Sequence, residues 1–398
     1  MLENAFTFAS TPKIIFETGS FQKLPDLIAD YGKNTLIVTG ASSLYKSGRF
    51  DELKKGLKDH SISFSNVKVA EEPSPDLIDE ITDKFRGENI SSVIAIGGGS
   101  VMDTGKAVSA MLTQEDPVIK YLEVVGEGKE HPGDKIPFIA VPTTSGTGSE
   151  ATKNAVLSNV GKDGFKKSLR HDNFIPNIAL LDPKLTVSCP ASITAASGMD
   201  AITQLLGAYT STKASPMTDS LALKALEYAG ESLVPAATDK GENLQFRAGM
   251  AYASLISGIT LANAGLGIVH GLASAVGGYF DIPHGVVCGT LLAEAVKLNI
   301  NLLRENNNQF YLKKYAKAGA VLSGENSLDL NSHHSIERYC DLLIDILEEW
   351  TTRLNIARLG EYGVSEDDLD KIAQKAGNKN NPIQLDNEQI KQLVGARL

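Results

Sequence analysis

The sequence predicts an α/β domain with a mainly parallel sheet, followed by an all-α C-terminal domain. Three observations predict this. Short apolar runs alternate with amphipathic helical segments over the first half of the chain. Two loops rich in glycine and hydroxyl side chains follow apolar strands in that half. After Pro190 the hydrophobic period becomes almost entirely helical. At 398 residues the chain suits two domains of roughly 200 residues each.

The elements of the first half follow one another in a regular order. Strands are expected at residues 13–17, 35–40, 63–69, 92–98, 137–143 and 177–183. Helices are expected near residues 20–31, 47–60 and 75–86, with a further helix opening after the strand at 92–98. This alternation is typical of parallel strands with helices on both faces of the sheet.

The second half is expected to be helical. The clearest helix begins at Ser215, which can cap it, and Pro216 fits its first turn. Residues 248–280 contain no Asp, Glu, Lys or Arg, but they hold seven glycines, so we expect two buried core helices rather than a membrane span. Residues 377–389 indicate a turn into a last helix. We therefore predict domains at 1–186 and 187–398.

Charge and cysteine content exclude several classes of function. The formal net charge of −10 disfavours nucleic acid and anionic membranes as partners, since both need a basic surface. Cys189, Cys288 and Cys340 are odd in number and lack CxxC spacing, which argues against a disulfide framework or a thiolate zinc site. The N-terminus has no signal-peptide pattern. We expect a cytoplasmic protein.

The two glycine-rich loops are candidate phosphate-binding sites. The first, AIGGGSVMDTGKA at residues 95–107, joins a strand end to a helix start, where glycines let the backbone approach a pyrophosphate. The second, VPTTSGTGSEAT at residues 141–152, also follows an apolar strand. Neither GxGxxG nor GxxxxGK[ST] is present, and a tight strand-to-helix turn is the alternative for the first loop. Together they would flank a crevice at the carboxyl ends of the strands of a Rossmann-like N-terminal sheet, which is where open α/β sheets bind ligands.

Four residues of the second half are candidate metal ligands. Asp200 and Gln204 stand one helical turn apart, so they share a face. His270 lies in the long apolar stretch, and His284 follows Pro283. One carboxylate, two imidazoles and one amide oxygen could surround a single divalent ion, although the neutral amide is a weak donor.

The loops, together with LDPKLT, GMDAITQ and the VHG and PHG segments, occur in the order that resembles the iron-containing (group III) alcohol dehydrogenase family. The resemblance covers essentially the whole chain. It implies a dinucleotide-binding α/β domain, a helical domain, and one divalent metal, Fe²⁺ or alternatively Zn²⁺, held by Asp200, Gln204, His270 and His284. It also implies a set of cofactor contacts. Together with Gly40 and Ser42, at the end of the strand expected at residues 35–40, these are Gly98, Gly99, Ser100, Asp103, Thr143, Thr144, Ser145, Lys166 and Leu185. Three of these residues also have a purely structural interpretation: Asp103 as an N-cap, Lys166 as a surface lysine and Leu185 as part of the core.

Three departures from the family pattern change the expectation. The family usually has His where this chain has Gln204, so metal affinity should fall, and a Gln204 that merely forms hydrogen bonds near the site is the alternative. Many members have another His where this chain has Ser274, which puts a proton relay there in doubt. Gly40 replaces the Asp common in NAD-preferring members, and Ser42 or Ser43 could donate to a 2′-phosphate, so NADP(H) is favoured over NAD(H).

The resemblance implies reversible hydride transfer between a small alcohol or aldehyde and NAD(P)(H), with no catalytic side chain beyond the metal site. The residues around His270 and His284 are mostly Gly, Ala and Val, which favours a small, rather apolar substrate. The alternatives are a polyol or dehydroquinate-synthase-like enzyme of the same superfamily, and a metal-free nucleotide-binding protein without dehydrogenase activity. A homodimer or larger homo-oligomer is expected.

Overall fold

The structure, a computed structural model, describes residues 5–161, 164–325 and 327–398 and divides into two compact units. The sheet unit comprises residues 9–159 and 164–189, and the helical unit comprises residues 190–398 with 5–8 and 160–161. The predicted domains, 1–186 and 187–398, placed residues 5–8 and 160–161 in the sheet domain. The structure groups them with the helices instead, where the Gly161 N–H donates to the Gly278 carbonyl at 3.2 Å.

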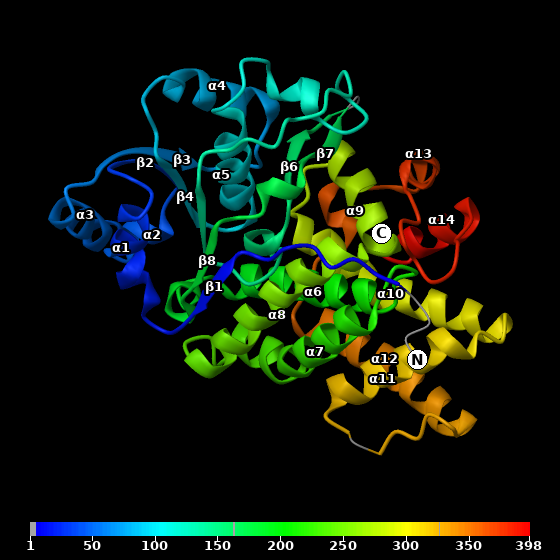
Figure 1. The fold of residues 1–398 in the computed structure, drawn as a ribbon. Helices are drawn as coiled ribbons and strands as arrows, with labels where there is room; N and C mark the ends of the chain where they lie inside the picture. The colour runs from blue at the N-terminus through cyan, green and yellow to red at the C-terminus, as the bar shows by residue number, and fades with distance from the viewer. Residues whose placement is uncertain (1–4, 162–163, 326) are drawn as a thin grey trace. The chain divides into compact units, whose positions relative to one another are not determined.

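The sheet unit is built on six parallel strands, as predicted (Figure 1). They are β1 (Lys13–Phe16), β2 (Asn34–Gly40), β3 (Ser63–Val69), β4 (Ser92–Gly97), β5 (Phe138–Pro142) and β8 (Ile178–Leu181), in the order β1-β8-β5-β4-β2-β3. An antiparallel hairpin of β6 (Asn154–Asn159) and β7 (Phe165–Arg170) was not predicted.

Helices cover both faces of this sheet. They are α1 (Leu24–Ala29), α2 (Ser43–Lys46), α3 (Arg49–Asp59), α4 (Pro75–Phe85) and α5 (Gly99–Met111), with short 3₁₀ helices η1 (Ser20–Lys23), η2 (Val118–Tyr121), η3 (Ser149–Ala151), η4 (Asp172–Phe174) and η5 (Pro183–Thr186). Alternate strand residues belong to different clusters: Val93 packs with α4 and α5, whereas Ile94 packs with α1 and α3. Strands buried on both faces explain the continuous apolar runs in the sequence.

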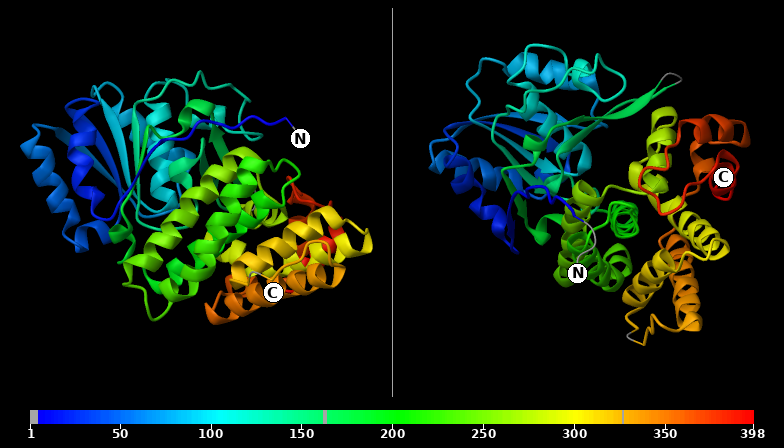
Figure 2. Two further views of the ribbon diagram at one scale, coloured as in Figure 1. Left: turned by 60° about the horizontal axis from the view of Figure 1, so that its bottom comes forward. Right: turned by 45° about the vertical axis from the view of Figure 1, so that its right-hand side comes forward.

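The helical unit contains nine α-helices within its described residues (Figure 2). They are α6 (Ala191–Tyr209), α7 (Pro216–Ala237), α8 (Leu244–Ala264), α9 (Ile268–Tyr279), α10 (His284–Glu305), α11 (Gln309–Ser323), α12 (His333–Arg353), α13 (Leu369–Lys375) and α14 (Asn387–Gly395), with η6 (Leu359–Tyr362) and η7 (Glu366–Asp368). Helix α6 packs against α7, α8 and α10, and α9 packs against α10. Ser215 caps α7 as expected, since its Oγ accepts from the Thr218 N–H.

The long apolar segment forms two core helices, as predicted. Helices α8 and α9 meet at a bend of 98°. Helix α10 also has the length and composition of a membrane-spanning helix, but 67% of its apolar window is buried inside the protein. The apolar residues of these helices are therefore accounted for by the core of the unit.

Candidate metal centre and cofactor-binding loops

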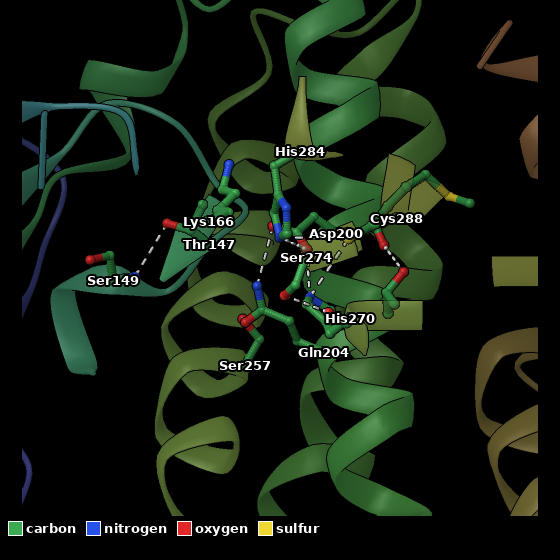
Figure 3. A network of polar contacts seen from close by, with 12 residues as sticks. Thr147, Ser149, Lys166, Asp200, Gln204, Ser257, His270, Ser274, His284 and Cys288 are labelled. Carbon is green, nitrogen blue, oxygen red and sulfur yellow. Dashed lines mark hydrogen bonds and ion pairs between the residues drawn. The ribbon is translucent and has the colours of Figure 1, made fainter. Parts of the chain in front are cut away.

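Three helices of the helical unit bring four potential metal ligands together: Asp200 on α6, His270 on α9, and His284 and Cys288 on α10 (Figure 3). The ligand atoms of all four lie within 4.8 Å of one another. His270 Nε2 is 3.2 Å from Asp200 Oδ1, and His284 Nε2 is 3.8 Å from the same oxygen. The structure therefore brings three of the predicted ligands together with a cysteine, and the fourth predicted ligand, Gln204, contacts Asp200.

Glycines allow helix α10 to approach helix α6 this closely. A Cβ at Gly285 would lie 2.5 Å from the Ala196 carbonyl oxygen, and one at Gly289 would lie 2.9 Å from the Met199 Cβ. Gly285 directly follows His284, which is the first residue of α10. The absence of side chains at these positions lets α10 place His284 and Cys288 beside Asp200.

The site combines a buried negative charge with hydrogen-bond donors. Asp200 is 1% exposed. Burial by itself would raise the pKa of Asp200, but the charge of His284 and the hydrogen bonds from His270 and Gln204 outweigh it and lower the pKa to about 2. The carboxylate is thus ionised at neutral pH, the form that binds a cation.

Gln204 reaches the site with its amide nitrogen. Its Nε2 donates to Asp200 Oδ2 at 3.2 Å, and its Oε1 accepts from Ser257 Oγ at 3.0 Å. The opposite amide orientation would set an amide oxygen against a carboxylate oxygen, acceptor against acceptor. The role of Gln204 as a metal ligand stays a prediction. The contact that the structure shows is its hydrogen bond to Asp200.

Ser274 lies one turn after His270 on α9. Its Oγ donates to the His270 carbonyl oxygen at 2.9 Å. The hydroxyl proton is therefore engaged within the helix.

Sequence reasoning missed Cys288 as part of this cluster. The i, i+4 spacing from His284 in a helix was available as a signal, since it places both side chains on one face. In the sequence, Cys288 was one of three cysteines whose number and spacing argued against a thiolate zinc site. In the structure it is fully buried, with Sγ 3.6 Å from His284 Nε2 and 3.7 Å from His270 Nε2.

The two glycine-rich loops pack against each other at the carboxyl ends of adjacent strands. β4 and β5 are neighbours, and the Thr143 N–H donates to the Gly97 carbonyl at 2.8 Å. A Cβ at Gly98 would lie 3.3 Å from Thr144 Oγ1, and one at Gly99 would lie 2.7 Å from Thr147 Cγ2. The first loop leads directly into α5, which begins at Gly99, and the first N–H groups of a helix have no partner within it, as an anion site requires.

Buried charges fix the second loop to α5. Asp103 accepts from Ser149 Oγ at 2.6 Å and from the Val156 N–H at 3.1 Å. Lys106, which the sequence did not single out, donates to the Ser149 carbonyl at 2.8 Å and to Thr152 Oγ1 at 2.9 Å. Burial lowers the pKa of Lys106 to about 8 and raises that of Asp103. Asp103 thus links α5 to Ser149 and Val156, and its contact with the cofactor stays a prediction.

The remaining predicted cofactor residues have varied surroundings. Glu72 links two of them, since Lys166 Nζ donates to its Oε2 at 3.0 Å and Ser100 Oγ to its Oε1 at 3.3 Å. Glu72 was not predicted. Leu185 is buried in a core cluster. Gly40 ends β2, and Ser42 precedes α2.

Comparison with known proteins decides the family. The N-terminal family model, iron-containing alcohol dehydrogenase, matches residues 11–183, and its C-terminal counterpart matches residues 194–398. The chain belongs to the iron-containing alcohol dehydrogenase family. Its members are oxidoreductases that act on alcohols, and the predicted family and fold class are confirmed.

Relatives within this family cover nearly the whole chain. An NAD-dependent methanol dehydrogenase of Bacillus methanolicus is 30% identical, over 93% of this chain and 92% of its own. A 1,3-propanediol dehydrogenase of Citrobacter freundii is 33% identical, over 87% and 85%. The solved structure of an alcohol dehydrogenase from Oenococcus oeni has a TM-score of 0.87 at 30% identity and covers 99% of this chain and 100% of its own.

The residues present fit the groups that this family implies. Asp200, His270 and His284 are oxygen and nitrogen donors suited to Fe²⁺ or Zn²⁺. In the cofactor loops, Ser145 Oγ is buried and has no hydrogen-bond partner among the described residues. A buried hydroxyl without a partner is costly unless a ligand satisfies it. Both observations favour a metal and a nucleotide at these positions.

Proposed function

We propose that this protein catalyses reversible hydride transfer between NAD(P)(H) and a small alcohol or aldehyde, and that it needs one divalent metal. Asp200, His270 and His284 would hold the metal. The convergence of these three donors, with Asp200 and His270 almost fully buried, is the observation that carries the proposal. The mostly apolar sequence around the two histidines favours a small substrate over a polyol or sugar acid.

Each part of the chain has a separate task in this reaction. When bound, the metal supplies Lewis acidity toward the substrate oxygen. Asp200 provides negative charge, and the Gln204 amide holds its second oxygen in place. Gly98, Gly99 and the start of α5 would receive the pyrophosphate. No further catalytic side chain is proposed, because the Ser274 hydroxyl is engaged with the His270 carbonyl.

Removal of the metal tests this function. Protein treated with a chelator should reduce a panel of small aldehydes with NADH or NADPH about 100-fold or more slowly, because Lewis acidity is worth several kcal/mol. Addition of Fe²⁺ or Zn²⁺ should restore the rate, and His270→Ala should not be restored. If metal-loaded protein turned over none of the aldehydes, the proposal would be refuted. The remaining interpretation would then be a nucleotide-binding protein without dehydrogenase activity. Preference for polyols in the same panel would support the rival enzyme class.

We propose further that NADP(H) is accepted, and preferred, because β2 ends in Gly40 rather than in a carboxylate. The relative from Bacillus methanolicus is named NAD-dependent, so this is a proposed difference from that protein. A Cβ at Gly40 would meet only Val101 Cγ2, at 3.9 Å, so a side chain fits there. A carboxylate at this position would repel a 2′-phosphate.

Gly40→Asp tests the cofactor proposal. The KM for NADPH should rise about tenfold or more through charge repulsion, while kcat/KM with NADH is kept or improved. Gly40→Asn is the matched neutral control and should keep the wild-type preference. Equal changes for both cofactors in Gly40→Asp would show that Gly40 does not face the ribose. The cytoplasmic location and the homo-oligomeric state stay predictions from the sequence.

A further inference from the structure

Cys288 lies at the position expected of a metal ligand. Its Sγ is nearly equidistant from the two imidazole nitrogens, at 3.6 Å from His284 and 3.7 Å from His270 (Figure 3). Zinc bonds of about 2.0 Å to nitrogen and about 2.3 Å to sulfur, at a tetrahedral angle, set the two atoms about 3.5 Å apart. The spacing from His270 to Asp200, 3.2 Å, also suits an edge of such a polyhedron. The spacing from His284 to Asp200 is longer, at 3.8 Å, and the four ligand atoms all lie within 4.8 Å of one another, so one ion could contact all four after the side chains move closer together.

The charge balance of the site also favours sulfur. A divalent ion with Asp200, two neutral imidazoles and the Gln204 amide leaves a net charge of +1 in a buried place. With a thiolate at Cys288 the net charge is zero, which lowers the cost of burial. Asp200 and Cys288 are at most 1% exposed, so solvent does little to screen an uncompensated charge.

The contacts of Gln204 leave the fourth position to Cys288. Its amide nitrogen donates to Asp200 Oδ2 at 3.2 Å, and its amide oxygen is directed toward Ser257 Oγ at 3.0 Å, a hydroxyl that also has the Ser254 carbonyl as an acceptor at 2.8 Å. This arrangement is typical of a residue that orients a ligand rather than binds the ion. The neutral amide is also a weaker donor than a thiolate toward a transition metal.

We propose that Cys288 binds the metal as a thiolate, in the place predicted for Gln204, and that the resulting set of Asp200, His270, His284 and Cys288 selects Zn²⁺ over Fe²⁺. The thiol proton passes to solvent as the sulfur–metal bond forms. A soft sulfur ligand favours zinc over iron within an otherwise similar site. A catalytic zinc site needs a position for substrate, so turnover with this ligand set would require either a fifth coordination position or the release of one of the four protein ligands. This inference rests on the proposed metal-dependent function.

Cobalt substitution of the whole protein tests the sulfur ligand directly. Metal-free protein is loaded with one Co²⁺ per chain, and the near-ultraviolet absorption is recorded. A sulfur-to-cobalt charge-transfer band is expected in the wild type. The band should vanish in Cys288→Ser and persist in Gln204→Ala. Cys340→Ser is the matched control, since Cys340 is also buried, on α12, with its Sγ donating to the Leu312 carbonyl.

Metal competition provides the second readout. Cys288→Ser should lose Zn²⁺ affinity by about tenfold or more, with a smaller loss for Fe²⁺, whereas Cys340→Ser keeps the wild-type ratio. X-ray absorption of the zinc-loaded wild type needs no variant and should show a sulfur neighbour at about 2.3 Å. Because the X-ray absorption measurement uses only wild-type protein, it remains valid even if Cys288→Ser folds poorly.

The outcomes separate the two proposals. Wild-type protein that binds one metal and turns over alcohol, but shows neither the cobalt band nor a sulfur neighbour, overturns the role of Cys288 and leaves the function intact. Loss of metal in Gln204→Ala together with unchanged binding in Cys288→Ser would return the fourth position to Gln204. Wild-type protein that binds no Co²⁺ or Zn²⁺ and lacks turnover overturns both.

Discussion

The side chain of Glu150 illustrates at the residue scale how burial sets protonation in the cofactor loops. Glu150 is 2% exposed, and its Oε1 has no hydrogen-bond partner among the described residues. Burial raises its pKa from 4.5 to about 7, against a backbone hydrogen bond and the charge of Lys106, which lower it. The folded protein therefore keeps this proton at pH values where the unfolded chain has lost it.

The sign of the resulting pH dependence is fixed. Between pH 4.5 and about 7 the folded state binds more protons at Glu150, so its contribution to stability is lost as the pH rises. Glu150→Gln should abolish this loss and be more stable than wild type at pH 8, by about 1–3 kcal/mol. Urea unfolding at pH 5 and pH 8 without cofactor measures the difference. If the free energies of unfolding of wild type and Glu150→Gln differed by the same amount at pH 5 and pH 8, Glu150 would be ionised in the folded protein at both pH values.

Single residues also show where sequence reasoning succeeds and stops. Helical spacing predicted that Asp200 and Gln204 share a face. The convergence of Asp200 with His270 and His284, which lie on two other helices, was implied by the resemblance to the family. The orientation of the Gln204 amide could not be predicted, since it depends on Ser257 from another helix. Glu72 was also out of reach, because its contacts with Ser100 and Lys166 join distant parts of the chain.

At the scale of elements, close packing of α6 and α10 sets the geometry of the candidate metal centre. A Cβ at Gly285 would lie 2.5 Å from the Ala196 carbonyl oxygen and 2.7 Å from its carbon, and backbone atoms cannot rotate away. Gly285→Ala should therefore push the helices apart, destabilise the fold by about 1–3 kcal/mol and weaken metal binding. Gly395→Ala is the control, because its Cβ would meet only Leu369 Cδ1 at an ordinary 3.7 Å.

Thermal unfolding and metal titration of the two glycine variants check this prediction. Gly395→Ala should match the wild type in both. Wild-type stability and metal affinity in Gly285→Ala would mean that the approach of α10 to α6 is looser than the structure indicates.

The elements also differ in how well the sequence predicted them. The four inner strands, β2, β4, β5 and β8, have continuous apolar runs because both of their faces are buried, whereas the edge strands β1 and β3 are largely exposed or half-buried; all six were predicted. The β6–β7 hairpin was missed. Its second strand, FKKSLR, contains two adjacent lysines and an arginine, and the two strands are separated in the sequence by more than the two residues that mark a short hairpin. This hairpin carries Lys166, so the surroundings of that residue could not be inferred.

At the scale of the whole molecule, the division into a sheet unit and a helical unit assigns different tasks to different parts of the chain. The cofactor loops follow β4 and β5 in the sheet unit, and the metal-ligand cluster belongs wholly to the helical unit. Substrate identity cannot be predicted at this scale, because it depends on individual side chains rather than on the order of elements.

The central claim is that Asp200, His270 and His284 hold one catalytic divalent ion. Anomalous diffraction at the absorption edge of the bound metal, from crystals of active protein, tests it most directly. We expect one peak per chain, about 2.0–2.2 Å from the Asp200 carboxylate and from the Nε2 atoms of both histidines. Crystals of protein that turns over alcohol, with a peak elsewhere or with none at these residues, would contradict the claim.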